Sequence, residues 1–464
     1  MKKFEFNKPF FMALLKLALP ILITEVIKSG ANFADNVMVG NLSEASLSGV
    51  TMANQFFMIY TLMLFGMLSG GILMISQYFG KKDRMAVDRV VSISIIVTMC
   101  VVAVFTAVVL LLPEQIMAIY TPDRAVIAEG VAYLRIVGWS YLLYGITTVY
   151  VSMLRSVRVV IVPMVVNSGA FLLNILLNWI FIFGNWGAPA MGVAGAALGT
   201  LISRFVETVA IVLYARFGDK VLGFRFKNTF RVNRVLLRDF FKYTLPVVLN
   251  EVMFAIAINM FSVIMGRMGQ SAMAAIGIAA TIHGILMIAN MAMGSATCIL
   301  VGNEIGAAQI DRAKRLANSL LLLNFCIGCL AAVGVMLLRG PILQLYPSIT
   351  AETYGVTNAF FAIVACYLPF DYVHYICVTG IFRGGGDTKF AMFAAFLPLW
   401  LWSVPLGALA GLVFQWSAVA TYAILKSDIF VRAVVCLIRL VRKKWIHVVV
   451  RQEEELWQEE ISAG

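Results

Sequence analysis

Charged residues are scarce in this sequence. Of its 464 residues only 13% are Asp, Glu, Lys or Arg, whereas 61% are hydrophobic. A soluble domain carries about 25% charged residues because its surface faces water. A chain of this size with so little charge cannot cover a water-facing surface, so much of its surface must face lipid.

Metal, redox and nucleotide chemistry lack the residues that they need. The chain has three histidines and seven cysteines, and the cysteines lie inside apolar runs. The Cys326-x-x-Cys329 spacing has no second pair, which favours membrane packing over a metal or redox site. The Gly384–Asp387 turn lacks the lysine of a phosphate-binding loop, and no nucleophile–base constellation is present. We therefore expect that the protein is not an enzyme and has no resident cofactor. We also expect that ATP is not its energy source.

Long apolar runs fill most of the chain. Because about 20 apolar residues span a bilayer as a helix, the sequence predicts an all-α membrane protein with about twelve transmembrane helices. The N-terminal run has no small-residue cleavage site and is predicted to be a retained first span. The predicted spans are residues 11–38, 50–78, 90–112, 126–152, 160–183, 191–215, 240–265, 276–301, 316–338, 354–381, 388–410 and 416–440.

Basic residues gather in every second gap between these spans. They include Lys81, Lys82 and Arg84, and seven more lie in the segment 216–239: Arg216, Lys220, Arg225, Lys227, Arg231, Arg234 and Arg238. By the positive-inside rule this side faces the cytoplasm, which places both termini there and the protein in the cell (inner) membrane. The net charge of +12 is interpreted as a topology signal that also contacts lipid headgroups, so no nucleic-acid partner is expected.

The two halves of the chain are related by an internal repeat. The single shift along the chain that places Lys16-x-x-Leu19-Pro20 over Lys242-x-x-Leu245-Pro246 also places Glu25 over Glu251. The repeat predicts two pseudo-symmetric six-helix bundles of parallel topology with a central cleft, which suits alternating access. The predicted divisions are an N-terminal bundle (1–215), a basic cytoplasmic linker (216–239), a C-terminal bundle (240–440) and a cytoplasmic tail (441–464).

Several polar residues of the first span lie on one helical face, although a charge inside a span costs about 2.5–3.5 kcal/mol. Glu25, Lys28, Asn32 and Asp35 share this face. Glu25 and Lys28 are one turn apart and can neutralise each other, whereas Asp35 has no basic residue one turn away. Pro20 removes a backbone donor, so a bend that serves as a hinge is predicted there.

The fifth and sixth spans offer partners for Asp35. Asn174 and Asn178 lie on one face of the fifth span, and Thr200 lies in the sixth. Carboxylate and amide oxygens are hard ligands that hold small cations. These residues predict either a Na⁺ site at Asp35, Asn174 and Asn178 or a protonatable pocket. Interhelical hydrogen bonding is the alternative.

The second half contributes further candidates. Glu251 follows Pro246, and Asp371 and His374 share a face of the tenth span. Glu251 and Asp371 are predicted to form a negative patch that attracts cationic substrates to the cleft. His374 is either a proton carrier or a hydrogen-bond partner of Asp371.

Taken in order, these motifs resemble the multidrug and toxic compound extrusion (MATE) family over essentially the whole chain. The resemblance rests on Leu17-Ala18-Leu19-Pro20, Asp35-x-x-x-Val39-Gly40, Asn174-x-x-x-Asn178-x-x-Phe181-Ile182-Phe183-Gly184, Leu245-Pro246-x-x-x-Asn250-Glu251 and the Gly380–Thr388 turn. It implies a twelve-helix exporter that expels organic, often cationic, compounds by antiport against Na⁺ or H⁺. The chain is expected to act as a monomer on a small-molecule substrate among membrane lipids.

The match to the branches of this family is uneven. Asp35 matches the first-helix acid and Asn174 an amide of the fifth helix, but Asn178 stands where the DinF-like branch has aspartate. Glu251 lies nearer its helix start than the NorM-like acid, and Asp371 lies close to the tenth-helix acid of that branch. The sequence therefore fits neither branch cleanly.

Two other functions remain open from the sequence. A flippase for lipid-linked oligosaccharides or peptidoglycan precursors is the first, although such carriers tend to have several cleft arginines. An intramembrane enzyme is the second, with Asp371 and His374 as its only candidate pair.

Overall fold

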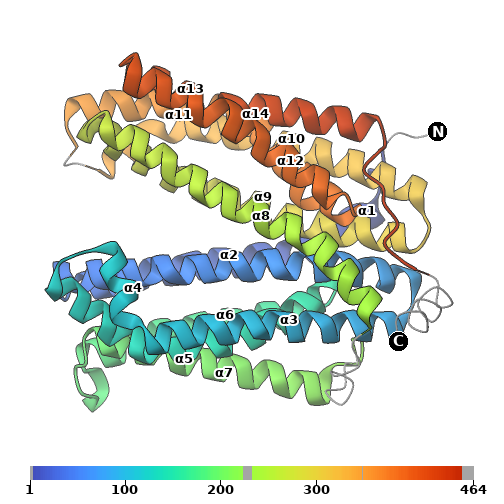
Figure 1. Cartoon of the computed structure of the whole chain (residues 1–464), viewed down its shortest axis with the longest axis horizontal. Coiled ribbons are helices and arrows are strands. Elements are labelled where there is room, and N and C mark those ends of the chain that lie inside the picture. The colour runs from blue at the N-terminus through green and yellow to red at the C-terminus, as the bar shows by residue number, and fades with distance from the viewer. Residues whose placement is uncertain (1–3, 223–232, 347–348, 452–464) are drawn as a thin grey trace. The chain divides into compact units, whose positions relative to one another are not determined.

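The computed structural model of the protein describes residues 4–222, 233–346 and 349–451, and in these ranges it consists of helices and short loops without a β-strand (Figure 1). The helices follow the predicted spans and extend beyond most of them. The helices are α1 (Lys8–Gly40), α2 (Glu44–Lys81), α3 (Arg84–Leu111), α4 (Pro113–Tyr120), α5 (Arg124–Ser156), α6 (Ile161–Phe183), α7 (Val193–Leu213), α8 (Arg234–Arg267), α9 (Gln270–Gly306), α10 (Ile310–Gln344), α11 (Ala351–Tyr375), α12 (Thr388–Pro398), α13 (Val404–Ala408) and α14 (Ala418–Val441).

Within the described residues, eleven helices are long and apolar enough to cross a membrane. The remaining predicted span, 416–440, is α14, which has the length of a span but carries Lys426, Asp428 and Arg432. Asp428 and Arg432 form an ion pair inside this helix, which lowers the cost of placing both charges at membrane depth. The prediction of an all-α, multi-pass membrane protein is confirmed.

Some short elements were not predicted. Helix α4 follows α3 directly and begins with Pro113, a residue that suits the first turn of a helix. Wider π-helical turns occur at η2 (Tyr214–Gly218), η4 (Ile376–Phe382), η5 (Leu399–Ser403) and η6 (Leu409–Val413). Two of these turns lie next to prolines, Pro398 before η5 and Pro405 between η5 and η6, where the regular hydrogen-bond ladder loses a donor.

The contacts divide the chain into two compact units. The first unit comprises Met1–Ala18, Gly80–Lys82 and Leu245–Val450, and the second comprises Leu19–Phe79, Asp83–Thr244 and Arg451–Gly464. The boundaries inside α1 and α8 fall after Ala18 and Thr244, which are equivalent positions of the repeat. Pro20 and Pro246 each lie just after such a boundary. The predicted division into 1–215, 216–239, 240–440 and 441–464 stays a proposal, and residues 223–232 and 452–464 lie outside the described residues.

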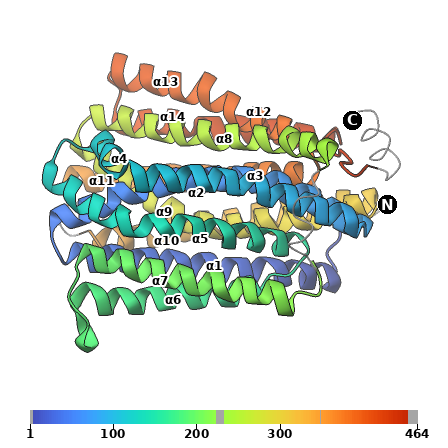
Figure 2. The same ribbon diagram turned by 60° about the horizontal axis from the view of Figure 1, so that its bottom comes forward.

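Each unit has its own apolar core. In the second unit α5 packs against α3 and α7, and α6 packs against α7 (Figures 1 and 2). Tyr60, Tyr141 and Leu134 are fully buried in this core. In the first unit α11 packs against α9, α10 and α14, and it buries Phe360 and Phe361 in the core of that unit. The helix centres therefore contact other helices, while apolar residues such as Leu111 remain exposed and suit a lipid environment.

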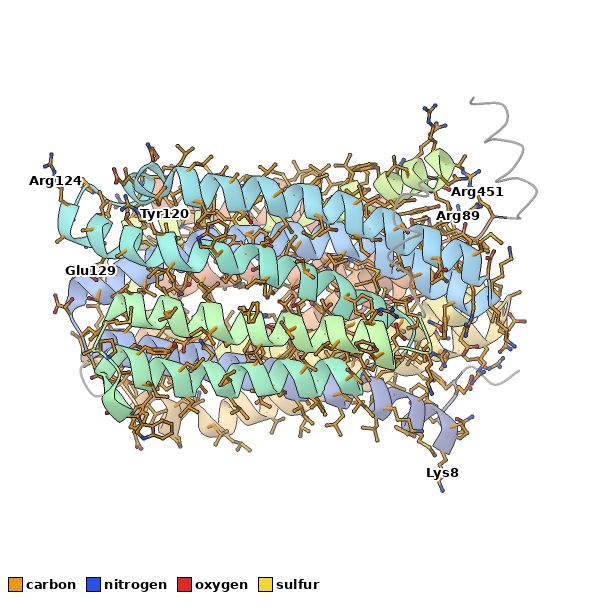
Figure 3. All side chains as sticks on the ribbon, turned by 90° about the horizontal axis from the view of Figure 1, so that it is seen from below. Lys8, Arg89, Tyr120, Arg124, Glu129 and Arg451 are labelled. Atoms are coloured by element: carbon orange, nitrogen blue, oxygen red, sulfur yellow. The ribbon has the colours of Figure 1, made fainter. Side chains whose placement is uncertain are left out.

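Charged residues mark the two ends of the second unit. Figure 3 shows Arg124 and Glu129 at one end and Arg89 and Arg451 at the other. Arg89 and Arg124 lie in the gaps before and after the predicted span 90–112. Their separation therefore agrees with loops that alternate between two sides. The orientation in the membrane stays a prediction.

The segment after α14 packs against the glycine-rich turn of the first unit. Gly386 and Ile446 form an antiparallel bridge, and the backbone N–H of His447 donates to the carbonyl of Gly385 at 2.7 Å. The indole of Trp445 is fully buried beside this turn. The turn therefore anchors the chain that leads to the C-terminal tail.

Candidate functional site

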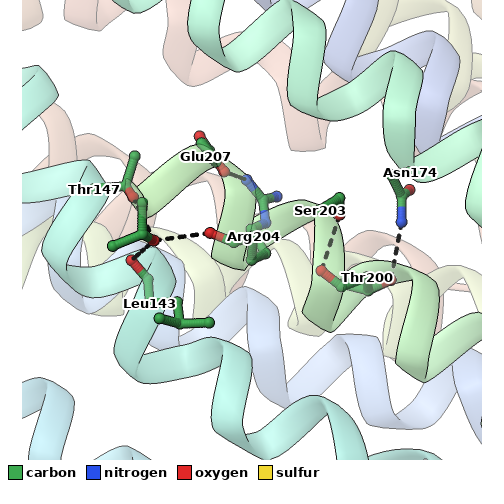
Figure 4. Close-up of polar contacts among 8 residues, drawn as sticks. Leu143, Thr147, Asn174, Thr200, Ser203, Arg204 and Glu207 are labelled. Atoms are coloured by element: carbon green, nitrogen blue, oxygen red, sulfur yellow. Dashed lines mark hydrogen bonds and ion pairs between the residues drawn. The ribbon is translucent and has the colours of Figure 1, made fainter. Parts of the chain in front are cut away.

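The four residues predicted to hold the coupling ion come together in the second unit. Asn178 of α6 donates a hydrogen bond from its amide to Asp35 Oδ1 of α1 at 2.7 Å. Asn174, one turn earlier on α6, has its amide nitrogen 3.2 Å from Thr200 Oγ1 of α7 (Figure 4). With the Asn174 amide turned the other way, its nitrogen donates to both Asp35 oxygens at 3.2 Å and its oxygen accepts from Thr200. This second orientation satisfies more donors and acceptors, so both amides then contact the carboxylate.

The close approach of α7 to α6 depends on Gly199. A Cβ atom at this position would overlap Asn178 Oδ1 and lie 3.1 Å from the Asn178 backbone nitrogen. The spacing of four residues between Asn174 and Asn178 places both amides on the face that Gly199 and Thr200 approach. The local sequence therefore determines how the amides reach Asp35.

Asp35 opens into a cavity of about 450 Å³ within the second unit. Helices α1, α2, α5, α6 and α7 contribute to its walls, and Asn32, Asn174, Asn178 and Thr200 are among the lining residues. The other walls combine small apolar and polar side chains with the rings of Phe57, Tyr133, Tyr141, Tyr144 and Phe171. A cavity that combines aromatic rings with convergent polar groups suits small organic molecules.

The cavity contains two basic residues whose partner acids do not line it. Lys28 Nζ lies 3.7 Å from Glu25 Oε2, so the ion pair between these residues is present in α1. Arg204 pairs with Glu207 at 2.6 Å, and its guanidinium lies over the rings of Tyr144 and Phe171 at 4.8 and 5.2 Å. Figure 4 shows Arg204 and Glu207 on the same helix as Thr200. Arg204 therefore has an acid and two rings as partners, whereas Lys28 has an acid.

Asp35 differs from these residues because, among the described residues, no lysine or arginine lies within ion-pair distance of it. Its partners are neutral amides, which stabilise the carboxylate without cancelling its charge. The carboxylate can therefore bind a proton, a metal cation or an organic cation in the cavity. Candidate cation ligands are Asp35, Thr200 Oγ1 and, after rotation of the amide, Asn178 Oδ1, which is buried without a hydrogen-bond partner.

The candidates of the second half belong to the first unit and lie in other surroundings. Glu251 Oε1 pairs with Arg383 at 2.7 Å, and Arg383 is almost fully buried. Asp371 Oδ2 lies 2.9 Å from His283 Nε2 of α9. The hydrogen-bond partner of Asp371 is therefore His283 and not His374, whose Nε2 is buried without a hydrogen bond. Both acids have a basic partner inside the unit, and the predicted negative patch stays a prediction.

Pro20 lies inside a continuous helix. Its carbonyl accepts a hydrogen bond from the Thr24 hydroxyl at 2.8 Å. Such side-chain bonds compete with the helical ladder and often accompany bends. The hinge role of Pro20 stays a prediction.

Sequence reasoning missed the aromatic walls of the cavity and the basic neighbours of Asp371. Tyr133, Tyr141 and Tyr144 lie eight and three residues apart within one predicted span, a helical spacing that places them on one face. This pattern was available as a signal, although aromatic residues also fill ordinary membrane cores. His283 gave no local signal because its partner lies 88 residues away.

The chain matches the MatE family model over residues 20–180 and 246–409, two segments that begin at prolines equivalent in the repeat, Pro20 and Pro246. It is 24% identical to the multidrug resistance protein NorM of Vibrio vulnificus strain YJ016, over 86% of this chain and 87% of that protein. It is 23% identical to the uncharacterized transporter YisQ of Bacillus subtilis strain 168, over 94% and 95% of the two chains. A solved structure of an outward-facing multidrug resistance MATE family transporter has a TM-score of 0.85 at 20% identity, covering 95% of this chain and 96% of that one. The structure of the D35N mutant of the MATE transporter VcmN of Vibrio cholerae has a TM-score of 0.86 at 16% identity, with coverage of 96% of this chain and 99% of that one.

Proposed function

Because the chain belongs to the MatE family of membrane transporters, we propose that it exports organic compounds, cationic ones among them, by antiport against H⁺ or Na⁺. The protein is a transporter and not an enzyme. The observation that carries the proposal is the Asp35 carboxylate, which accepts hydrogen bonds from amides, has no basic partner among the described residues, and lies in a cavity with five aromatic rings in its walls. The relatives named for multidrug resistance support drug extrusion as the biological role.

One carboxylate can couple two cations because they compete for it. A proton or Na⁺ on Asp35 removes the negative charge that holds an organic cation, and a bound organic cation opposes protonation. The aromatic walls, including Phe57, Tyr144 and Phe171, add dispersion and cation–π attraction for flat organic cations. Each cation therefore displaces the other from Asp35, which is the requirement for antiport.

The geometry favours the proton over Na⁺ as the coupling ion. Asn178 presents its N–H group to Asp35, and the favoured orientation of Asn174 does the same. A Na⁺ site needs oxygens that converge on the ion, so these amides would have to rotate before they could act as ligands. A proton can bind the carboxylate without rotation of either amide.

Ion binding must also favour one conformation, because a ligand shifts an equilibrium only by its difference in affinity between the states. We propose that protonation of Asp35 changes the bend of α1 near Pro20, where the boundary between the two units lies. Alternating access through a cleft between the bundles, with both termini in the cytoplasm and the protein in the cell membrane as a monomer, completes the proposal.

The experiment follows efflux of ethidium from liposomes that contain the purified protein, under an imposed pH or Na⁺ gradient. We expect movement driven by the pH gradient, and its loss in Asp35→Asn. The matched control is Glu114→Gln, which alters an exposed acid outside the cavity and should retain full activity. Full gradient-driven efflux by Asp35→Asn would reject the assignment. Absence of movement under both gradients would favour the flippase, and lipid-linked substrates would then be tested.

A further inference from the structure

A lysine ammonium is surrounded by aromatic rings in the first unit. Nζ of Lys426 (α14) lies 5.1 Å from the ring centroid of Phe261 (α8) and 5.8 Å from those of Tyr367 (α11) and Tyr422 (α14). In the part of the chain that the structure describes, no carboxylate lies within ion-pair distance of this ammonium. Three rings around one cation form an aromatic cage, the arrangement by which proteins recognise organic ammonium groups.

A carboxylate lies next to this cage. Tyr367 and Asp371 are four residues apart on α11, so they share a helical face. The Tyr367 ring lies 5.9 Å from the ring of His283, which holds Asp371 at 2.9 Å. Rings and a nearby acid are the two features that bind a primary or quaternary ammonium.

The cage occupies the place in the repeat that corresponds to the Asp35 site. In the register of the repeat, Phe261 corresponds to Asp35 and Lys426 to Thr200. The ring contact between Phe57 and Tyr141 at 5.2 Å corresponds to the contact between His283 and Tyr367 at 5.9 Å. The second unit thus has a carboxylate beside an open cavity at this place, whereas the first unit has rings around an ammonium of the chain itself.

We propose that the cage is a second binding site, specific for organic ammonium groups, and that Lys426 is its resident occupant. An arriving organic cation binds there only by displacing the Lys426 ammonium from Phe261, Tyr367 and Tyr422. When the cation leaves, the lysine returns, so the rings do not lose their cation. A ligand therefore binds at this site only if it interacts with the three rings more favourably than the Lys426 ammonium does. The proposal shares with the proposed function only the class of ligand, and it concerns binding and not the driving ion.

Removal of the lysine should leave a vacancy of known size. Lys426→Ala removes three methylene groups and the ammonium, which is the shape of n-propylammonium. We expect n-propylammonium to raise the melting temperature of Lys426→Ala in detergent, with a concentration dependence that gives its Kd. The wild type, whose cage is occupied, should bind the same amine at least tenfold more weakly. Phe261→Leu added to Lys426→Ala should weaken binding again by at least fivefold.

The controls separate a cage from a general effect of amines. n-Propanol, which has the same shape without the charge, should not stabilise Lys426→Ala. Lys389→Ala removes an exposed lysine at the start of α12 and should gain no amine binding. Equal stabilisation of Lys426→Ala and the wild type by n-propylammonium, or equal stabilisation by n-propanol, would overturn the proposal. Loss of ethidium efflux in the liposome assay would leave this binding result unchanged, so the two proposals can fail separately.

A measurement on the wild type covers the case in which Lys426→Ala does not fold. In protein with ¹³C at the lysine ε-carbons, the Lys426 resonance, assigned by its loss in Lys426→Arg, should be shifted by the ring currents of the cage. Saturating tetramethylammonium should move this resonance towards the position of exposed lysines. A resonance that stays in place at saturation would show that no organic cation displaces the lysine, and the proposal would be rejected.

Discussion

The hydrogen bond between Asn178 and Asp35 depends on the absence of a side chain at Gly199. A methyl group there would overlap Asn178 Oδ1, so Gly199→Ala forces the amide to rotate or α7 to move away. A hydrogen bond to a charged group contributes about 1.5–3 kcal/mol. We therefore expect Gly199→Ala to lower gradient-driven ethidium efflux by at least tenfold, measured in liposomes at equal protein content.

Gly169→Ala is the matched control for this change. Gly169 lies on the neighbouring helix α6, and a Cβ atom there would meet no other atom within 4 Å. The control should transport at the wild-type rate and have a melting temperature equal to that of the wild type or higher. Equal activity of Gly199→Ala and Gly169→Ala would contradict a role for the Asn178 hydrogen bond in coupling.

The Asp35 site shows which parts of a functional site can be predicted from the sequence. Asp35, Asn174 and Asn178 could be selected from the sequence because polar groups are costly in apolar helices and their spacing defines a face. Their contacts confirm that the groups meet. The partner of Asp371 could not be selected in this way, because His283 lies on another helix and only packing brings the two together. Lys426 was overlooked for the same reason, since its neighbours are apolar rings from three helices.

Among the secondary-structure elements, the spans were predictable and their irregular turns were not. An apolar run long enough to cross a bilayer becomes a helix because every backbone group must be hydrogen-bonded there. The π-helical turns η5 and η6 lie beside Pro398 and Pro405, which mark a disturbed hydrogen-bond ladder but not the type of turn. The turn η4 contains no proline and gave no such signal. The grouping of Met1–Ala18 with the C-terminal helices was equally invisible, because it follows from contacts between distant segments such as Glu5 and Arg312.

The turn between η4 and α12 offers a test of how the chain after α14 is anchored. A Cβ atom on Gly385 would lie within 2.6 Å of the carbonyl oxygen and the ring of Trp445. Gly385→Ala should therefore displace the buried indole and destabilise the protein by about 1–3 kcal/mol. The measurement is the melting temperature in detergent, together with protease sensitivity of the chain after Val441. Gly355→Ala in α11, where a Cβ atom would meet nothing within 4 Å, should leave the protein as stable as the wild type or more so.

The repeated halves of the molecule have taken different chemical roles at corresponding places. At one place of the repeat, the N-terminal half has Asp35 and Thr200 and the C-terminal half has Phe261 and Lys426. A duplicated transporter with identical halves would carry two equivalent carboxylates. Here the described residues offer one carboxylate without a basic partner in the cavity of the second unit, so transport should depend on a single exchangeable proton.

The presence of one such carboxylate predicts how the rate of efflux depends on pH. Asp35 is the only carboxylate among the residues that line the cavity. The rate of ethidium efflux should therefore rise about tenfold for each unit by which the external pH falls, as expected for one proton, before it saturates. Asn178→Asp places a second carboxylate at hydrogen-bond distance from the first, and two such acids cannot both ionise without strong repulsion. The pair then holds one proton more tightly than Asp35 does alone. We expect the pH dependence of efflux by Asn178→Asp to move to higher pH with a first-order slope, and Asp35→Asn to show no gradient-driven efflux at any pH. A pH dependence of Asn178→Asp that coincides with that of the wild type would mean that residue 178 does not face the coupling proton, and the carboxylate–amide arrangement would then be structural.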